Sequence, residues 1–280
     1  MGKVSEFQDG LLVQIAVVLV AAPVVALGIT GMLDTFSSPD EQARQRPPAD
    51  SQPSTAAQEI RQRPPFDPLS TPPLRGREVP SVDVSGPGRT SEGFRNWALQ
   101  VHQTTKVDVQ ALQAYANAQA RAALLWPGCN LNWSTLAGVG WVETRHGTYD
   151  GNLFGGSSLD DNGVATPPIV GPALDGVGFA YVGDYDGGAY DNDPVHDHAV
   201  GPMQFIPESW DRLSVDADGD GYANPHQIDD AALTAASLLC ADGNDMSTRE
   251  GWKQSLFSYN QSDEYLAEVR EAANKYAWLS

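Results

Sequence analysis

The sequence predicts a mainly α-helical domain, interrupted by a loop-rich insertion and preceded by an apolar segment and a linker. Helical patterns occur at residues 109–125, 133–146, 207–213, 229–240 and 262–279. Residues 150–200 contain nine aspartates, many glycines and no lysine or arginine. Such a stretch has no apolar periodicity and favours loops. The folded part is expected to span residues 97–280, which is a size typical of one domain.

The first element is the N-terminal segment, residues 1–33. No charged side chain occurs from Gly10 to Leu33. A helix of this length crosses a hydrocarbon core of about 30 Å. The apolar run of a cleavable signal peptide is shorter, about 7–15 residues, so a retained membrane anchor is favoured over a cleaved signal.

The second element, residues 34–96, is rich in Pro, Ser, Gln and Arg and contains three Pro-Pro pairs. It has no apolar periodicity, so it cannot bury enough surface to offset the entropy of ordering the chain. We expect a disordered, proline-rich linker. An extended chain of this length can hold the folded domain roughly tens of ångströms from a membrane.

The third element is the helical domain itself. Asp108 is a preferred N-cap residue before the run VQALQAYANAQARAALL, and Pro127 follows that run. The next helix is capped by Asn132 or Asn130 and is expected to stop at Gly147.

Charge and cysteine content limit the function of this domain. The whole chain has a formal net charge of −19, and residues 97–280 hold 25 Asp and Glu against 8 Lys and Arg. Such a surface repels phosphate backbones, which excludes nucleic acid as a partner but suits carbohydrate or a cation. Cys129 and Cys240 both lie in the domain. Behind an export signal they favour one disulfide, and the alternative is two buried free thiols.

Glu143 is the candidate catalytic residue. It lies in the segment LAGVGWVETRHG, and the seven residues before it carry no charge. A carboxyl group among apolar side chains loses solvation, which raises its pKa. A raised pKa suits a general acid near neutral pH. The alternative is a solvated Glu143 that pairs with Arg145 or His146 at the end of the helix.

Two further segments place polar groups among apolar ones. In GPMQF, the amide of Gln204 lies between Met203 and Phe205. Such an amide is either a satisfied core group or a group that binds a sugar. In FSYN, Tyr259 and Asn260 place polar groups at the end of an apolar run.

These segments occur in a recognisable order: VETRHG, GPMQFIPESW, DADGDGYANP, DDAALTAASLL and SYN. Together they resemble the lytic transglycosylases of the lysozyme-like superfamily, and most closely the membrane-bound lytic transglycosylase B branch. The resemblance covers about residues 105–280. It implies a goose-type or soluble lytic transglycosylase-like domain, a peptidoglycan substrate, a monomer, no organic cofactor and a single catalytic glutamate.

The resemblance implies that Glu143 is the acid/base. It would protonate the oxygen between N-acetylmuramic acid and N-acetylglucosamine. It would then take a proton from the 6-hydroxyl of the muramic acid, so that a 1,6-anhydro ring closes without water.

The resemblance also implies the substrate-binding residues. Gln204 matches a glutamine that lines the sugar cleft, with Met203 and Phe205 as its apolar wall. Tyr259 would hold the catalytic carboxyl, and Asn260 would bind the N-acetyl group of the substrate.

The segment DADGDGYANPHQIDD, residues 216–230, has carboxylates at loop positions 1, 3 and 5 and a glycine at position 6. This is the spacing of a calcium-binding loop, although Gln227 stands at position 12, where Glu is usual. The resemblance to the transglycosylase B branch implies a slightly longer loop that an aspartate closes. The ligands would be Asp216, Asp218, Asp220, the carbonyl of Tyr222 and Asp230. The alternative is an acidic turn that binds no ion.

We therefore expect a membrane-anchored lytic transglycosylase that faces the cell wall outside the membrane and remodels peptidoglycan. Two alternatives remain. A hydrolytic muramidase on the same fold normally uses two carboxylates, and an aspartate of residues 150–200 could supply the second. A non-catalytic peptidoglycan-binding scaffold would also make use of an anchor and a linker.

Overall fold

The computed structural model describes residues 71–148 and 156–280. The expected anchor, residues 1–33, lies outside this part of the chain, as does the expected linker up to residue 70. None of the described helices combines the length and the apolar composition required to span a bilayer.

Helices dominate the described residues, which confirms the mainly α class. The helices are η2 (Thr90–Phe94), α2 (Arg95–Thr105), α3 (Val109–Leu125), α4 (Trp133–Thr144), α5 (Pro207–Leu213), α6 (Ile228–Cys240), α7 (Arg249–Tyr259) and α8 (Asp263–Leu279). The strands are β1 (Ser158–Leu159), β2 (Ala165–Thr166), β3 (Val170–Ala173) and β4 (His198–Val200). β1 pairs antiparallel with β2, and β3 pairs antiparallel with β4.

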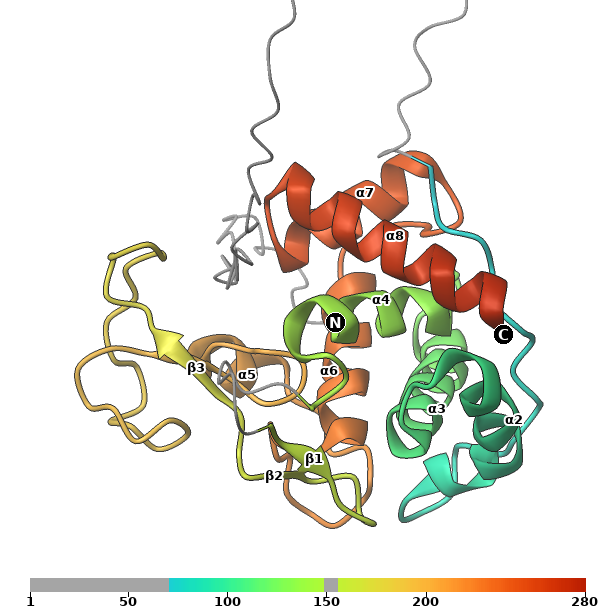
Figure 1. The fold of residues 1–280 in the computed structure, drawn as a ribbon, viewed down its shortest axis with the longest axis horizontal. Helices are drawn as coiled ribbons and strands as arrows, with labels where there is room; N and C mark the ends of the chain where they lie inside the picture. Colours follow the sequence, from blue (N-terminus) through green and yellow to red (C-terminus); the bar gives the residue numbers. More distant parts are fainter. Residues whose placement is uncertain (1–70, 149–155) are drawn as a thin grey trace, which may run out of the picture. The chain divides into compact units, whose positions relative to one another are not determined.

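α6 is the central helix of the core. Every residue of α6 except Ser237 is buried. A helix that is apolar on nearly all sides must be covered by other elements, and α3 packs along it (Figure 1). The sequence explains this position, because DDAALTAASLLC consists mostly of small and apolar residues.

α4 and α8 pack closely against each other (Figure 1). Gly138 of α4 makes this approach possible. A Cβ atom at this position would lie 2.6 Å from the carbonyl oxygen of Val269 in α8 and 3.1 Å from the Cβ atom of Ala273. Only glycine fits so close to another backbone. This packing sets the distance between the side chains that α4 and α8 carry.

The expected helices are present, with small changes of boundary. α3 has the expected limits, and Asp108 caps it by accepting a hydrogen bond from the N–H of Gln110. α5, α6 and α8 begin and end within one residue of the expected limits. α4 ends at Thr144 and not at the expected Gly147, because Arg145 adopts the left-handed conformation with φ 54°.

The structure corrects the expected start of the folded domain at residue 97. Residues 71–96 are packed on the helices through side chains, such as the buried Val84 and Phe94, and through their backbone. The indole N–H of Trp133 donates to the carbonyl of Arg77, and that of Trp97 donates to the carbonyl of Glu78, both at 3.0 Å. Backbone acceptors leave no mark in amino-acid composition, and the buried apolar side chains of this segment are few, so its composition alone favours a linker. α2 and α7 were not expected from the sequence.

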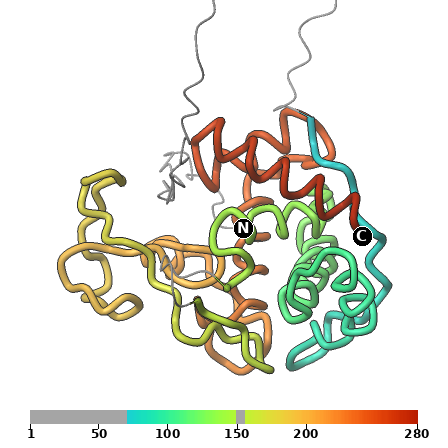
Figure 2. The backbone as a smooth tube through the Cα atoms, in the orientation of Figure 1, coloured from blue at the N-terminus to red at the C-terminus, as the bar shows by residue number. Residues whose placement is uncertain are grey.

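Residues 156–200 form turns and short strands, as expected for the insertion. A small apolar cluster anchors this region: Leu174 and Ile206 are buried, and Phe179 and Val182 pack against them. Figure 2 shows the yellow part of the chain looping away from the helices between β3 and β4. The insertion is therefore a separate layer of loops beside the helical core.

A disulfide joins Cys129 to Cys240, with their Cα atoms 5.4 Å apart. Cys129 follows α3, and Cys240 is the last residue of α6. The predicted disulfide is confirmed, and it covalently fixes two helices that already pack together.

Candidate active site

Glu143 lies in the last turn of α4, facing α8. The hydroxyl of Tyr265 in α8 donates a 2.7 Å hydrogen bond to Oε1 of Glu143. Tyr265 is itself buried, so its hydroxyl is held in place by packing. The close contact of α4 and α8 at Gly138 brings these two side chains together.

The carboxyl group of Glu143 is surrounded by protein, although the residue as a whole keeps partial exposure. Burial raises the pKa of Glu143 to about 8, and the charge of Glu268 adds to this rise. The hydrogen bond from Tyr265 acts in the opposite direction, because it favours the anion. Glu143 is therefore mainly protonated at neutral pH, as a general acid requires.

The alternative pairing of Glu143 with its helix-end neighbours is not what the structure shows. Arg145 lies over the ring of Trp141, 4.2 Å from the centroid, and donates to the Trp141 carbonyl. The ring of His146 is held by two tyrosine hydroxyls, those of Tyr115 at 3.1 Å and Tyr276 at 2.8 Å. Burial lowers the pKa of His146 to about 3, so its ring is neutral.

Among the described residues, Tyr265 and not Tyr259 donates the hydrogen bond to Glu143. The hydroxyl of Tyr259 donates to the carbonyl of Met203 at 2.6 Å. Its ring stacks on Tyr265, with centroids 6.2 Å apart and planes at 9°. Tyr259 thus supports the tyrosine that holds the carboxyl, and it is too deeply buried to reach solvent.

The GPMQF segment contacts both α4 and α7 at this site. The hydroxyl of Thr144, next to Glu143, donates to the carbonyl of Pro202 at 2.6 Å. The side chains of Met203 and Phe205 are fully buried, and the ring of Phe205 packs against Tyr259 with centroids 5.7 Å apart. In the described conformation these two side chains form core and not a solvent-facing wall.

Gln204 has a local structural role. Its side-chain amide donates to the carbonyls of Ala199 at 3.2 Å and Gly201 at 3.0 Å, and its backbone has φ 50°. Its carbonyl oxygen Oε1 faces Gly171, where an added Cβ atom would lie 2.9 Å away. The amide therefore closes its own turn. Contact between Gln204 and a sugar stays a prediction.

Asn260 ends α7, and its N–H donates to the carbonyl of Leu256 at 2.9 Å. It is buried, with 5 % of its surface exposed. Its expected contact with an N-acetyl group also stays a prediction.

The acidic loop after α5 brings three of the expected ligands together. Oxygen atoms of Asp216, Asp218 and Asp230 all lie within 4.8 Å of one another, so this group could hold a metal ion. Asp220 is not part of that group, and its carboxylate accepts from the N–H of Tyr222. Burial raises the pKa of Asp230 to about 7. The carbonyl of Tyr222 stays a predicted ligand.

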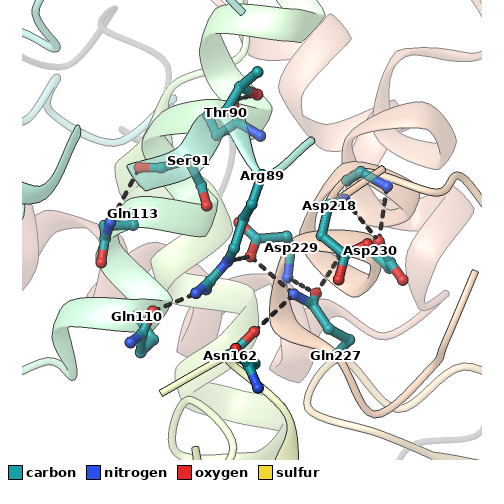
Figure 3. A network of polar contacts seen from close by, with 12 residues as sticks. Arg89, Thr90, Ser91, Gln110, Gln113, Asn162, Asp218, Gln227, Asp229 and Asp230 are labelled. Atoms are coloured by element: carbon teal, nitrogen blue, oxygen red, sulfur yellow. Dashed lines mark hydrogen bonds and ion pairs between the residues drawn. The ribbon is translucent and has the colours of Figure 1, made fainter. Parts of the chain in front are cut away.

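Gln227 is not at a ligand position of this loop but at the start of α6. Its Oε1 accepts from the N–H of Asp230 at 3.0 Å, and its amide donates to Asp229 (Figure 3). Asp229 is buried and pairs with Arg89, whose Nε lies 2.7 Å from the carboxylate. This network ties the segment before η2 to the acidic loop, and in it Gln227 caps α6.

A hollow of about 120 Å³ lies elsewhere, between the segment that precedes η2 and α7. It is lined by Pro72, Pro73, Arg75, Asn130, Asn132, Thr135, Met246, Ser247 and Trp252. None of these residues carries a carboxyl group, so this hollow cannot supply a general acid.

A comparison with known protein families finds a match for the part of the chain that contains Tyr265. Residues 198–279 match the family of the transglycosylase SLT domain. No curated protein and no solved structure matches the chain. The SLT domain implies lytic transglycosylase activity on peptidoglycan. The matched residues begin at β4 and include GPMQF, the acidic loop and α5 to α8.

Glu143 lies outside the matched SLT segment, yet its hydrogen-bond partner Tyr265 lies inside it. Thr144 also lies outside the matched segment, and its hydroxyl donates a hydrogen bond to Pro202 inside it. The α4 helix therefore completes a site that the SLT segment builds on its other sides.

Two residues that act on Glu143 were not expected from the sequence. Tyr265 and Glu268 are three positions apart on α8, so they lie on the same helix face. Tyr265 bonds to Glu143, and the charge of Glu268 acts on it. The spacing was readable from the sequence, but which face of α8 meets Glu143 depends on helix packing.

Proposed function

We propose that the protein is a peptidoglycan lytic transglycosylase in which Glu143 is the acid/base. The observation that carries this proposal is the contact of a protein-surrounded carboxyl with Tyr265 of the SLT domain. The raised pKa of about 8 gives that carboxyl a proton at neutral pH. A lysozyme-like arrangement of the helices is part of the same proposal.

In the proposed reaction, Glu143 donates its proton to the oxygen between N-acetylmuramic acid and N-acetylglucosamine, and the bond from C1 to that oxygen breaks. The resulting carboxylate accepts the proton of the 6-hydroxyl on the same muramic acid. That oxygen bonds to C1 and closes the 1,6-anhydro ring. Water is neither consumed nor released, and Glu143 ends the cycle protonated.

Tyr265 has a positioning role in this cycle. Its hydroxyl donates to Oε1 of Glu143 and stabilises the anion that exists between the two proton transfers. Burial favours the acid form, and the hydrogen bond limits how far the pKa rises. Both forms of the carboxyl are thereby accessible near neutral pH.

The hydrolytic alternative has one observation in its favour. Glu268 is a second carboxylate near Glu143, and its charge contributes to the raised pKa of Glu143. Glycoside hydrolases normally use two carboxylates. In a muramidase reaction, Glu268 on α8 would be a candidate for the second carboxylate, beside the aspartates of the insertion.

Mass spectrometry of products from purified peptidoglycan tests the proposal. The wild type is expected to release anhydro-muropeptides, and Glu143→Gln is expected to release none. Glu250→Gln, at an exposed position of α7, is the matched control and should retain activity. Reducing N-acetylmuramic acid ends in the wild-type digest would show a muramidase. Unchanged release by Glu143→Gln would remove Glu143 from the chemistry.

We also propose that residues 1–33 anchor the protein in the membrane and that the folded domain lies on the cell-wall side. The uncharged run from Gly10 to Leu33 supports the anchor. The Cys129–Cys240 disulfide supports an oxidising compartment for the domain. Fractionation of cells that produce the full chain, followed by protease treatment of intact spheroplasts, tests both statements.

A further inference from the structure

A second group of carboxylates lies in the insertion, before the SLT segment begins. Oxygen atoms of Asp184, Asp186 and Asp197 all lie within 4.8 Å of one another. Asp184 and Asp186 belong to a turn, and Asp197 immediately precedes β4. The group therefore joins two parts of the loop that are more than ten residues apart in the sequence.

Asp197 has an unsatisfied buried oxygen. None of its surface is exposed. Its Oδ1 accepts from the N–H of Tyr185 at 2.9 Å, whereas its Oδ2 is buried and has no hydrogen-bond partner among the described residues. A buried carboxylate oxygen without a partner is costly, because the group has lost water and gained nothing in return. A cation at Oδ2 would offset this cost.

The protein supplies no such charge nearby in the sequence. Residues 175–197 contain six aspartates and no lysine or arginine. The histidines of this region are engaged elsewhere: His198 contacts Asp193 at 3.1 Å, and His196 packs edge-on against Tyr181. Asp184 and Asp186 instead add negative charge beside Asp197, which raises the cost of keeping all three ionised.

Backbone hydrogen bonds fix the turn that carries the other two carboxylates. Oδ1 of Asp184 accepts from the N–H groups of Gly187 and Gly188 at 2.9 Å and 3.1 Å. The carboxylate of Asp186 accepts from the N–H of Tyr190 at 3.0 Å. These contacts hold the two side chains next to Asp197 without neutralising its free oxygen.

We propose that Asp184, Asp186 and Asp197 bind a divalent cation, with Ca²⁺ as the ion of best fit. All three ligands are hard oxygen donors on a loop, which suits Ca²⁺, whereas Mg²⁺ demands a stricter octahedral geometry. Backbone carbonyls and water would complete the six to eight ligands typical of Ca²⁺. The cation would supply the charge that Oδ2 of Asp197 lacks.

Binding at this site would tie the turn at Asp184 to β4. β4 leads directly into the GPMQF segment, which contacts the active site through Pro202 and Thr144. The insertion is otherwise anchored by a small apolar cluster. We therefore expect the cation to stabilise the fold of the insertion rather than to act on substrate.

Calcium titration of the full chain by calorimetry, after treatment with a chelator, tests the proposal. The other candidate site is silenced first, with Asp216→Asn and Asp218→Asn in the parent protein. Into this parent we introduce Asp197→Asn, which keeps an acceptor for the N–H of Tyr185. Asp175→Asn, another acid of the insertion outside the group, is the matched control.

The parent and the Asp175→Asn control are expected to bind one Ca²⁺ and to gain thermal stability from it. Asp197→Asn is expected to weaken binding by about tenfold or more and to lose the calcium-dependent rise in Tm. With the chelator present, Asp197→Asn should be at least as stable as its parent, because a buried charge is gone. A parent that binds no calcium, or equal binding in Asp197→Asn, would overturn the proposal.

Discussion

The hydroxyl of Tyr265 donates a 2.7 Å hydrogen bond to Oε1 of Glu143, across the interface of α8 and α4. Two opposing effects meet at this contact. Burial disfavours the glutamate anion, and the hydrogen bond favours it. Burial is the larger effect, so the pKa of Glu143 rises to about 8.

Tyr265→Phe removes the hydrogen bond that favours the anion of Glu143. The pKa of Glu143 should rise further, so the limb of the pH–rate profile that reports Glu143 should move to higher pH. A hydrogen bond to a charged group contributes about 1.5–3 kcal/mol, which corresponds to about one to two pKa units. The rate constant should fall about tenfold or more, because the anion formed after the first proton transfer is less stable.

The matched control for Tyr265→Phe is Tyr276→Phe, on the same helix. Its hydroxyl contacts His146 and not Glu143. This variant should lose stability but keep the wild-type pH profile. An equal shift of the profile in both variants would show that the effect comes from α8 as a whole and not from the contact with Glu143.

Glu268→Gln should shift the same limb in the opposite direction. The negative charge of Glu268 raises the pKa of Glu143, so its removal lowers that pKa and moves the limb to lower pH. Glu268 is exposed, so water screens the interaction, and a shift of about half a pKa unit is expected. The shift should shrink in high salt. A loss of all activity at every pH would instead support a direct role for Glu268, as in a muramidase.

The raised pKa of Glu143 was predictable because its helix is uncharged over seven preceding residues, a local property of the sequence. The disulfide was predictable from the count of two cysteines. Tyr265 was not, because the contact depends on the close approach of α4 and α8 at Gly138. The sequence shows the glycine but not the helix that it meets.

The contacts of Tyr259 and of residues 71–96 differ from those expected for a similar reason. Tyr259 was assigned to Glu143 from its place in the SYN motif, whereas three-dimensional packing directs its hydroxyl to Met203. Residues 71–96 look like a linker by composition, yet their carbonyls accept hydrogen bonds from the buried indoles of Trp97 and Trp133. Contacts to the backbone do not depend on residue type, and the segment's buried side chains, such as Val84 and Phe94, are too few to change its composition.

Thr144→Val should destabilise the protein and impair the site. The hydroxyl of Thr144 donates to the carbonyl of Pro202 and accepts from the N–H of Gly147 at 2.9 Å. Valine keeps the shape but leaves these two backbone groups unsatisfied, at a cost of about 1–3 kcal/mol. Urea unfolding measures this loss. Thr144→Ser keeps the hydroxyl and should recover most of the stability, and equal losses in both variants would contradict the assigned role.

Removal of the disulfide should lower stability strongly. Cys129 and Cys240 are 111 residues apart, so the bond restricts a long loop of the unfolded chain. The chain-entropy account gives about 4–5 kcal/mol for a loop of this length. Cys129→Ala combined with Cys240→Ala should show this loss in urea unfolding. Chemically reduced wild type should show a similar loss, and a change below about 1 kcal/mol would mean that the unfolded chain is already compact there.

Glu143→Gln should stabilise the fold while abolishing activity, and the gain should depend on pH. The pKa of Glu143 is about 8 in the folded protein and 4.5 for an ordinary glutamate. Between these values the folded state holds a proton that the unfolded state lacks, so wild-type stability falls as pH rises. Glutamine has no such proton. The stability difference should thus be small below pH 4.5, grow above it and level off above pH 8.

Because Glu143 keeps partial exposure, we expect a gain of about 1–2 kcal/mol at high pH, seen as a rise in Tm of a few degrees. Thermal unfolding at a series of pH values measures it. Glu250→Gln, at an exposed position, should show no such trend. A pH-independent difference for Glu143→Gln would mean that the carboxyl is already ionised in the folded protein. In that case Glu143 could not hold the proton that the proposed reaction requires.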